Sequence, residues 1–122
     1  MALGNTSATT AIGDIVYKQS SATGTADDDL SGSSTATIYG VELSSSAPET
    51  NYVKLWDDNN PTVGTDAPTL IFPVSANSNQ TVIVMGGVLF SNLSLACVQT
   101  GGVGGTTDPS GDVSVEIIVD LS

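Results

Sequence analysis

Hydrophobic and polar residues alternate along much of this chain, and the alternation is clearest at its C-terminal end. In the segment 112–121, "DVSVEIIVDL", one face would carry Val113, Val115, Ile117, Val119 and Leu121. The other face would carry Ser114, Glu116 and Asp120, with Ile118 as the one apolar exception. Successive residues of a strand point to opposite faces, so the pattern predicts a half-buried strand. Its polar face favours an antiparallel sheet with one side in water.

Six further segments are predicted to be strands, most of them from the same period. They are residues 14–18, 35–43, 52–56, 69–74, 81–85 and 93–98. Segment 93–98 places Leu93, Leu95 and Cys97 on one face, and segment 69–74 does so for Leu70, Phe72 and Val74. Helical spacing of apolar residues over three turns is not found without interrupting Gly, Pro or β-branched residues.

Three of these segments lead to more specific expectations. In segment 35–43, strict alternation puts Tyr39, Val41 and Leu43 on one face and Ile38, Gly40 and Glu42 on the other. Segment 81–85, "TVIVM", is apolar on both faces, which is typical of a central strand. Pro73 lacks a backbone N–H, so segment 69–74 is expected at a sheet edge or as a strand end.

The breaks between the segments are rich in Gly, Pro, Asn, Asp and Ser, the residues that close turns. About seven short antiparallel strands in 122 residues predict an all-β fold, a single β-sandwich or barrel of the jelly-roll or immunoglobulin-like kind. We assign residues 12–122 to this domain and residues 1–11 to a flexible N-terminal arm. The polar segment 19–34 is unusually long for a hairpin loop and is also expected to be mobile.

Charge narrows the classes of function. The chain has 13 acidic residues, two lysines and no Arg or His, which gives a net charge of −11. Such a chain repels nucleic-acid phosphates and anionic membrane surfaces. The acids suit a soluble, self-repelling surface, a basic partner, or display in many copies. With one Cys and no signal peptide in "MALGNTSATTA", we expect synthesis and folding in a reducing cytoplasm.

Catalytic chemistry has little support in the residues. The absence of His removes Ser-His and Cys-His nucleophile pairs and His-ligated zinc. "TGGVGGTT" does not have the spacing of a dinucleotide-binding loop, and Cys97 is expected to be a buried core residue. We therefore predict a protein that is not an enzyme and uses no cofactor.

Calcium is the one metal that the sequence brings into question. Asp57, Asp58 and Asn60 offer oxygen ligands in "DDNN", but the spacing of an EF-hand loop is missing. The competing interpretation is an Asx turn that ends the strand before Pro61. We expect no metal site and favour the turn.

The candidate contact residues are Tyr52, Lys54 and Trp56, which alternation places on one face of segment 52–56. Three interpretations remain open. The row stacks on sugar rings, or it packs against a neighbouring subunit, where Trp and Tyr are enriched. Alternatively, Tyr52 and Trp56 point into the core of their own domain while the Lys54 side chain reaches water.

From Tyr52 onward the order of motifs resembles a small β-sandwich domain found in virion structural proteins of tailed bacteriophages. The motifs are "YVKLWD", "PTVGTDAPTLIFPVSANSNQTV", "GGVLFSNLSLACVQTGG" and "VSVEIIV". The landmarks are Val53 and Leu55, the "PTVGTDAP" connector, Gly87 before Phe90, and "LSLACV". The resemblance spans roughly the last 70 residues and is carried by structural rather than catalytic motifs.

The resemblance implies a non-enzymatic capsid decoration (cement) protein on the outer surface of the virion. Its partner would be the major capsid protein, whose lattice it would bind and stabilise, and its form would be a homotrimer. Two alternatives stay open, a subunit of a phage tail or head fibre and a carbohydrate-binding module that uses Tyr52 and Trp56.

Overall fold

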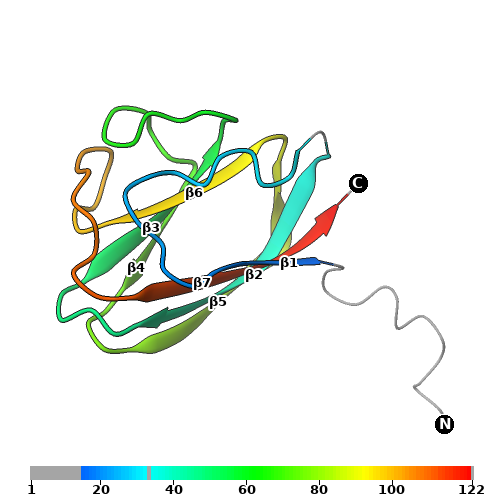
Figure 1. Ribbon diagram of the computed structural model, residues 1–122. Helices are drawn as coiled ribbons and strands as arrows, with labels where there is room; N and C mark the ends of the chain where they lie inside the picture. The colour runs from blue at the N-terminus through cyan, green and yellow to red at the C-terminus, as the bar shows by residue number, and fades with distance from the viewer. Residues whose placement is uncertain (1–14, 33, 122) are drawn as a thin grey trace, which may run out of the picture.

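The computed structural model describes residues 15–32 and 34–121 and contains seven β-strands (Figure 1). They are β1 (Ile15–Gln19), β2 (Ala36–Ser45), β3 (Asn51–Asp57), β4 (Leu70–Val74), β5 (Asn79–Phe90), β6 (Leu93–Val98) and β7 (Val113–Leu121). Each of the seven segments predicted from alternation overlaps one of these strands, and the part of the chain described here holds no helix. The predicted all-β class is therefore confirmed.

The strands form two antiparallel sheets that face each other across one core (Figure 1). The four-stranded sheet has the order β1-β7-β2-β5, and the three-stranded sheet has the order β4-β3-β6. This arrangement is a β-sandwich, as expected. β4, which contains Pro73, lies at the edge of its sheet, so that expectation is also confirmed.

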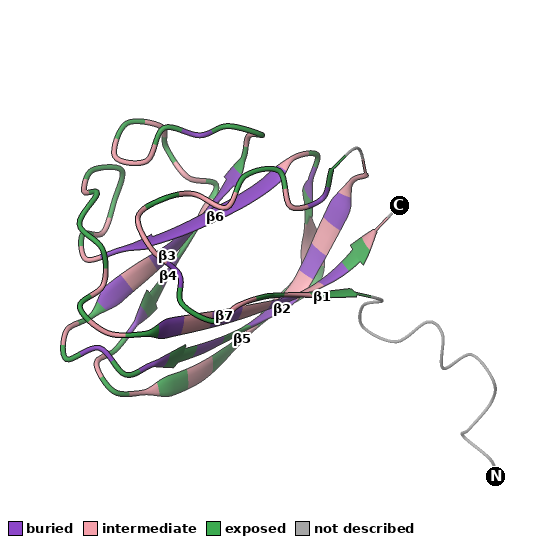
Figure 2. Ribbon diagram, viewed as in Figure 1, coloured by how far each residue is buried: buried purple, intermediate pink, exposed green. Residues whose placement is uncertain are grey.

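The core is built from the inward faces of both sheets (Figure 2). β7 lies between β1 and β2 and buries Val113, Val115, Ile117 and Val119 completely. From the opposite sheet, β6 contributes Leu93, Leu95 and Cys97. Both sets are the faces that alternation predicted, because the positions of a strand that point to one side recur at every second residue.

The expected faces of β2 were wrong because the strand contains a β-bulge. Ile38, Val41 and Leu43 are all buried in the core, whereas Tyr39 is only half-buried. Opposite β7, Ile38 pairs with Val119 and Gly40 pairs with Ile118, so Tyr39 is the extra residue. A bulge inserts one residue and exchanges the faces of all positions beyond it.

The expected central position of segment 81–85 was also wrong. β5 is the outermost strand of its sheet and pairs with β2. It continues through Gly86 and Gly87, which have positive φ angles of 78° and 77°. Gly40 of β2 pairs with Ile83, whereas Ile38, only two residues away, pairs with Val88. The two glycines lie in the stretch of β5 between these pairs, which is therefore irregular.

The long segment that follows β1 is held against the free edge of β6. Its backbone N–H groups at Asp27 and Leu30 donate to Leu95 O and Leu93 O at 2.8 and 2.6 Å, and Cys97 N–H donates to Thr23 O at 2.8 Å. Far from being a free loop, the described part of segment 19–34 acts as an irregular additional strand. The predicted N-terminal arm, residues 1–11, lies outside the described residues.

The central position of β7 leads to a first prediction. We expect Ile117→Ala to lower the free energy of unfolding by about 2–5 kcal/mol, because it leaves a cavity between the two sheets. Val103→Ala removes methyl groups from an exposed side chain and should change it by less than about 0.5 kcal/mol. Urea unfolding of the two variants measures both values, and equal effects would contradict the assigned core.

Candidate interaction surface

Tyr52, Lys54 and Trp56 lie together on the outward face of β3, while Val53 and Leu55 point into the core. The alternation of β3 was therefore predicted correctly. The outward face is nevertheless not free, since Lys54 and Trp56 are 0% and 1% exposed. The loops 58–69 and 99–112 of the same chain cover them, an arrangement that none of the three interpretations from the sequence included.

Trp56 is fixed by the loop that follows β3. Its indole Nε1–H donates to Asp66 O at 2.9 Å. The Asp66 carboxylate in turn accepts a hydrogen bond from Thr62 N–H at 2.8 Å and closes the turn. A buried indole whose single donor is occupied has no free ring face on which a sugar could stack.

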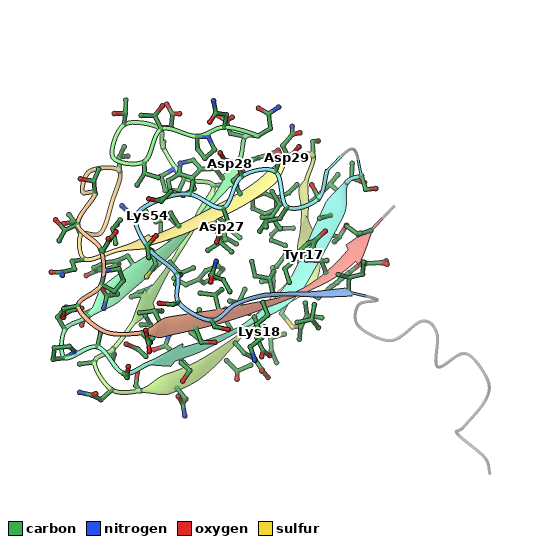
Figure 3. The ribbon with its side chains drawn as sticks, in the orientation of Figure 1. Tyr17, Lys18, Asp27, Asp28, Asp29 and Lys54 are labelled. Atoms are coloured by element: carbon green, nitrogen blue, oxygen red, sulfur yellow. The ribbon has the colours of Figure 1, made fainter. Side chains whose placement is uncertain are left out.

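Lys54 is covered by the other loop, at Gly104 (Figure 3). Its ammonium donates to Gly104 O at 3.0 Å, and burial lowers the pKa of this lysine. The Tyr52 ring packs under the same loop at Gly101, where an added Cβ would lie 3.1 Å from the ring. Of the three candidate contact residues, Tyr52 alone remains partly exposed.

Glu49 ties the far end of that loop to the start of β3. Its carboxylate accepts hydrogen bonds from the Ser110 hydroxyl and from Asn51 Nδ2, the latter at 2.6 Å. These bonds stabilise the charged form and lower the pKa of Glu49. The loop 99–112 is thus anchored just before β3 at Glu49 and in the middle of β3 at Lys54.

The acidic pair after β3 is occupied by backbone donors. Asp57 Oδ1 accepts hydrogen bonds from Ser91 N–H and Asn92 N–H at 2.9 and 2.8 Å, so it closes the turn between β5 and β6. Asp58 Oδ1 accepts one from Asn60 N–H at 2.9 Å, which is the predicted Asx turn. Within the described residues, no three His, Cys, Asp or Glu side chains gather in a way that could hold a metal ion.

The second acidic run, Asp27 to Asp29, lies in the segment along β6 (Figure 3). Asp27 accepts a hydrogen bond from Gln19 Nε2 at 2.8 Å. The fully buried Ser94 joins this segment to the loop after β3: its hydroxyl accepts from Asp29 N–H at 2.9 Å and donates to Asp58 O at 2.6 Å. In both acidic runs, carboxylate or backbone groups therefore hold loops in place.

The most exposed apolar side chains lie on the outward side of the four-stranded sheet, along β5. Ile83, Met85 and Leu89 are 72%, 89% and 60% exposed. Together with the half-buried Tyr39 and Ile118 they form what we call the β5 surface. All of these except Leu89 line a hollow of about 350 Å³ with Gly40, Thr81, Val82, Val84 and Gly86.

The β5 surface was not identified from the sequence, although its signal is visible there. "TVIVM" is apolar at every position after Thr81, which fits either a central strand or an edge strand with an uncovered outer face. Periodicity cannot distinguish these two positions. The order of strands in the sheet decides between them, and that order depends on contacts far apart in the sequence.

No protein-family model, curated protein or solved structure matches this chain.

Ser94 provides a prediction about the fastened loops. We expect Ser94→Ala to lower the free energy of unfolding by about 1–3 kcal/mol, because Asp29 N–H and Asp58 O both lose their partner. Ser114→Ala, on the outward face of β7, should cost less than about 0.5 kcal/mol. Chemical denaturation compares the two, and similar small losses would show that the Ser94 bridge contributes little.

Cys97 provides a prediction about alkaline pH. Burial, with a smaller contribution from the charge of Glu49, raises the pKa of the Cys97 thiol from 9.0 to about 12. The folded state therefore holds the thiol proton more tightly than the unfolded state does. The stability that the protonated Cys97 contributes is complete below pH 9 and is lost as the pH rises toward 12.

We therefore expect wild type to lose about 2 kcal/mol relative to Cys97→Ala between neutral pH and about pH 10.5. Urea unfolding of both proteins at the two pH values measures this difference. A stability difference that does not change with pH would contradict the assigned shift.

Proposed function

We propose that this protein is a non-enzymatic structural protein of a tailed-bacteriophage virion, a capsid decoration (cement) protein that binds the outer surface of the major capsid protein lattice. The observation that carries the proposal is the β5 surface, an exposed apolar area. The other candidate features of the domain, the β3 row and the acidic runs, make contacts within the chain. Exposed apolar patches of this kind are typical of surfaces that bind protein.

The distribution of charge supports a protein partner. The two lysines are the only basic side chains in the chain, and both are engaged. Lys18 forms an ion pair with Glu116 at 3.3 Å, and Lys54 donates to Gly104 O. Because the chain has 13 acidic residues and only these two lysines, it has no basic area that could bind phosphate groups. Binding by burial of apolar area is the mode that this surface supports.

Residues 52–121 resemble β-sandwich domains of phage virion proteins, and this resemblance is the reason for proposing the capsid as the partner. The loop-covered sandwich is suited to this role, because a domain that binds without chemistry needs a fixed shape more than a cleft. An acidic surface also keeps copies soluble before assembly.

A subunit of a phage tail or head fibre is the alternative within the same class, and location in the particle separates the two. The carbohydrate-binding module is less well supported, because Trp56 is buried and its Nε1–H is bonded to Asp66 O. We therefore do not propose sugar binding.

The proposal predicts that the purified protein binds saturably to capsids that lack it and raises the temperature at which those capsids break open. Co-sedimentation measures the binding, a thermal release assay measures the stabilisation, and electron microscopy locates the added density. Capsids that already carry the protein are the control and should take up none. Absence of binding, or density on the tail alone, would contradict a decoration role.

A further inference from the structure

The β5 edge of the four-stranded sheet differs from the other three sheet edges. An edge strand exposes backbone N–H and C=O groups that attract further strands, and proteins normally protect such edges. β6 is covered by segment 23–30 through backbone hydrogen bonds. β4 and β1 are five residues long, and they carry Pro73 and Lys18 respectively.

β5 has less protection than these. It runs for 12 residues and contains no Pro and no charged residue. Its irregularity at Gly86 and Gly87 interrupts regular pairing, but it also leaves Met85 projecting from the sheet. The outcome is an edge that resists continuous strand addition while presenting apolar side chains on its outward side.

Charge restricts which partner can approach this surface. In a contact between identical copies about a twofold axis, each residue meets the same patch of the partner. Most surfaces of a chain with net charge −11 would then bring carboxylates together. The β5 surface contains none, although three acids border it on the same face: Glu42 and Glu116, paired with each other on β2 and β7, and Asp120, which follows Ile118 by two residues and pairs with Thr37 beside Leu89.

The shape of the surface is also self-complementary. Met85 is the most exposed large apolar side chain among the described residues, and it lines the 350 Å³ hollow together with Tyr39, Ile83 and Ile118. A projecting, flexible Met beside an apolar hollow can fill the equivalent hollow of a second copy while its own hollow is filled in return.

We propose that the β5 surface is the contact between two copies of this chain, related by a twofold axis, with Met85 of each copy in the hollow of the other. The inference takes from the proposed function that the β5 surface binds protein, but it assigns that surface to a second copy, so the dimer would have to separate before the same surface binds a capsid. The product is a dimer, which differs from the trimer that the resemblance implies, because a surface that pairs with itself closes after two copies.

The test is sedimentation equilibrium of the full-length chain over a range of concentrations, without capsids. Wild type should approach twice the chain mass of 12.3 kDa. Met85→Glu places an uncompensated carboxylate in each hollow and should raise the dissociation constant at least about 30-fold. Because Met85 is 89% exposed, the variant is expected to fold, which its circular dichroism and thermal transition verify.

Val103→Glu is the matched control. It adds the same charge at an exposed apolar residue of the loop 99–112, away from the β5 surface, and should leave the dimer unchanged. Added salt should tighten the wild-type dimer, because it screens the repulsion between two acidic copies. Binding to a basic partner would show the opposite dependence on salt.

A monomer at all concentrations would overturn the proposal, and so would a trimer or a dimer that Met85→Glu leaves intact. Loss of the dimer in both Glu variants would also overturn it, because the effect would then follow net charge rather than position. Each of these outcomes is separate from capsid binding, which is measured on particles. Failure of either proposal can therefore be recognised without the other.

Discussion

The unpaired edges of the two sheets are the constraint on which much of this structure depends. A sandwich of four and three strands has four edges, and a domain of 122 residues has little additional chain with which to cover them. Segment 23–30 is used for the β6 edge, and its attachment there brings Asp29 beside Ser94. Through the Ser94 hydroxyl, the covered edge also holds the loop that follows β3.

A second consequence concerns the outward face of the three-stranded sheet. That sheet is narrow, and two loops of the chain fold over it at Trp56 and Lys54. The loops satisfy the polar groups of these side chains with backbone carbonyls, which allows both residues to be buried without a charged partner. The cost of burying the Lys54 ammonium appears as its lowered pKa. The aromatic row therefore stabilises loops within one chain, and the outward apolar area lies on the other sheet.

The strands and most inward faces were predictable, whereas the features that depend on strand order were not. Apolar residues recur at every second position from Val113 to Val119 and from Leu93 to Cys97, so the sequence alone identifies the faces that point into the core. The bulge at Tyr39 changes that period by one residue and leaves no distinct mark in "TATIYGVEL". The Gly86-Gly87 pair looks like a turn, yet β5 continues through it.

Dependence on contacts between distant segments also explains why the candidate site was only partly predicted. Alternation correctly placed Tyr52, Lys54 and Trp56 on one face of β3, but the covering residues Asp66 and Gly104 are 10 and 50 positions away from their partners. No local pattern announces that such loops return to the strand. The edge position of β5 is likewise set by pairing with β2, about 40 residues earlier in the chain, rather than by its own composition. Contacts between distant segments, which one sequence does not reveal, decided both outcomes.

Net charge and the β5 surface have complementary physical effects. A strongly acidic chain is kept apart from its own copies by repulsion over most of its surface, and this repulsion also limits unspecific association through exposed apolar residues. Ile83, Met85 and Leu89 can thus remain in water on an edge strand without the Lys or Pro that usually protects one. Repulsion of this kind depends on orientation: it is weakest where an uncharged area meets an uncharged area. In the proposed dimer the same acids would therefore restrict the apolar contact to one place and one relative orientation, which is how a small surface becomes a specific one.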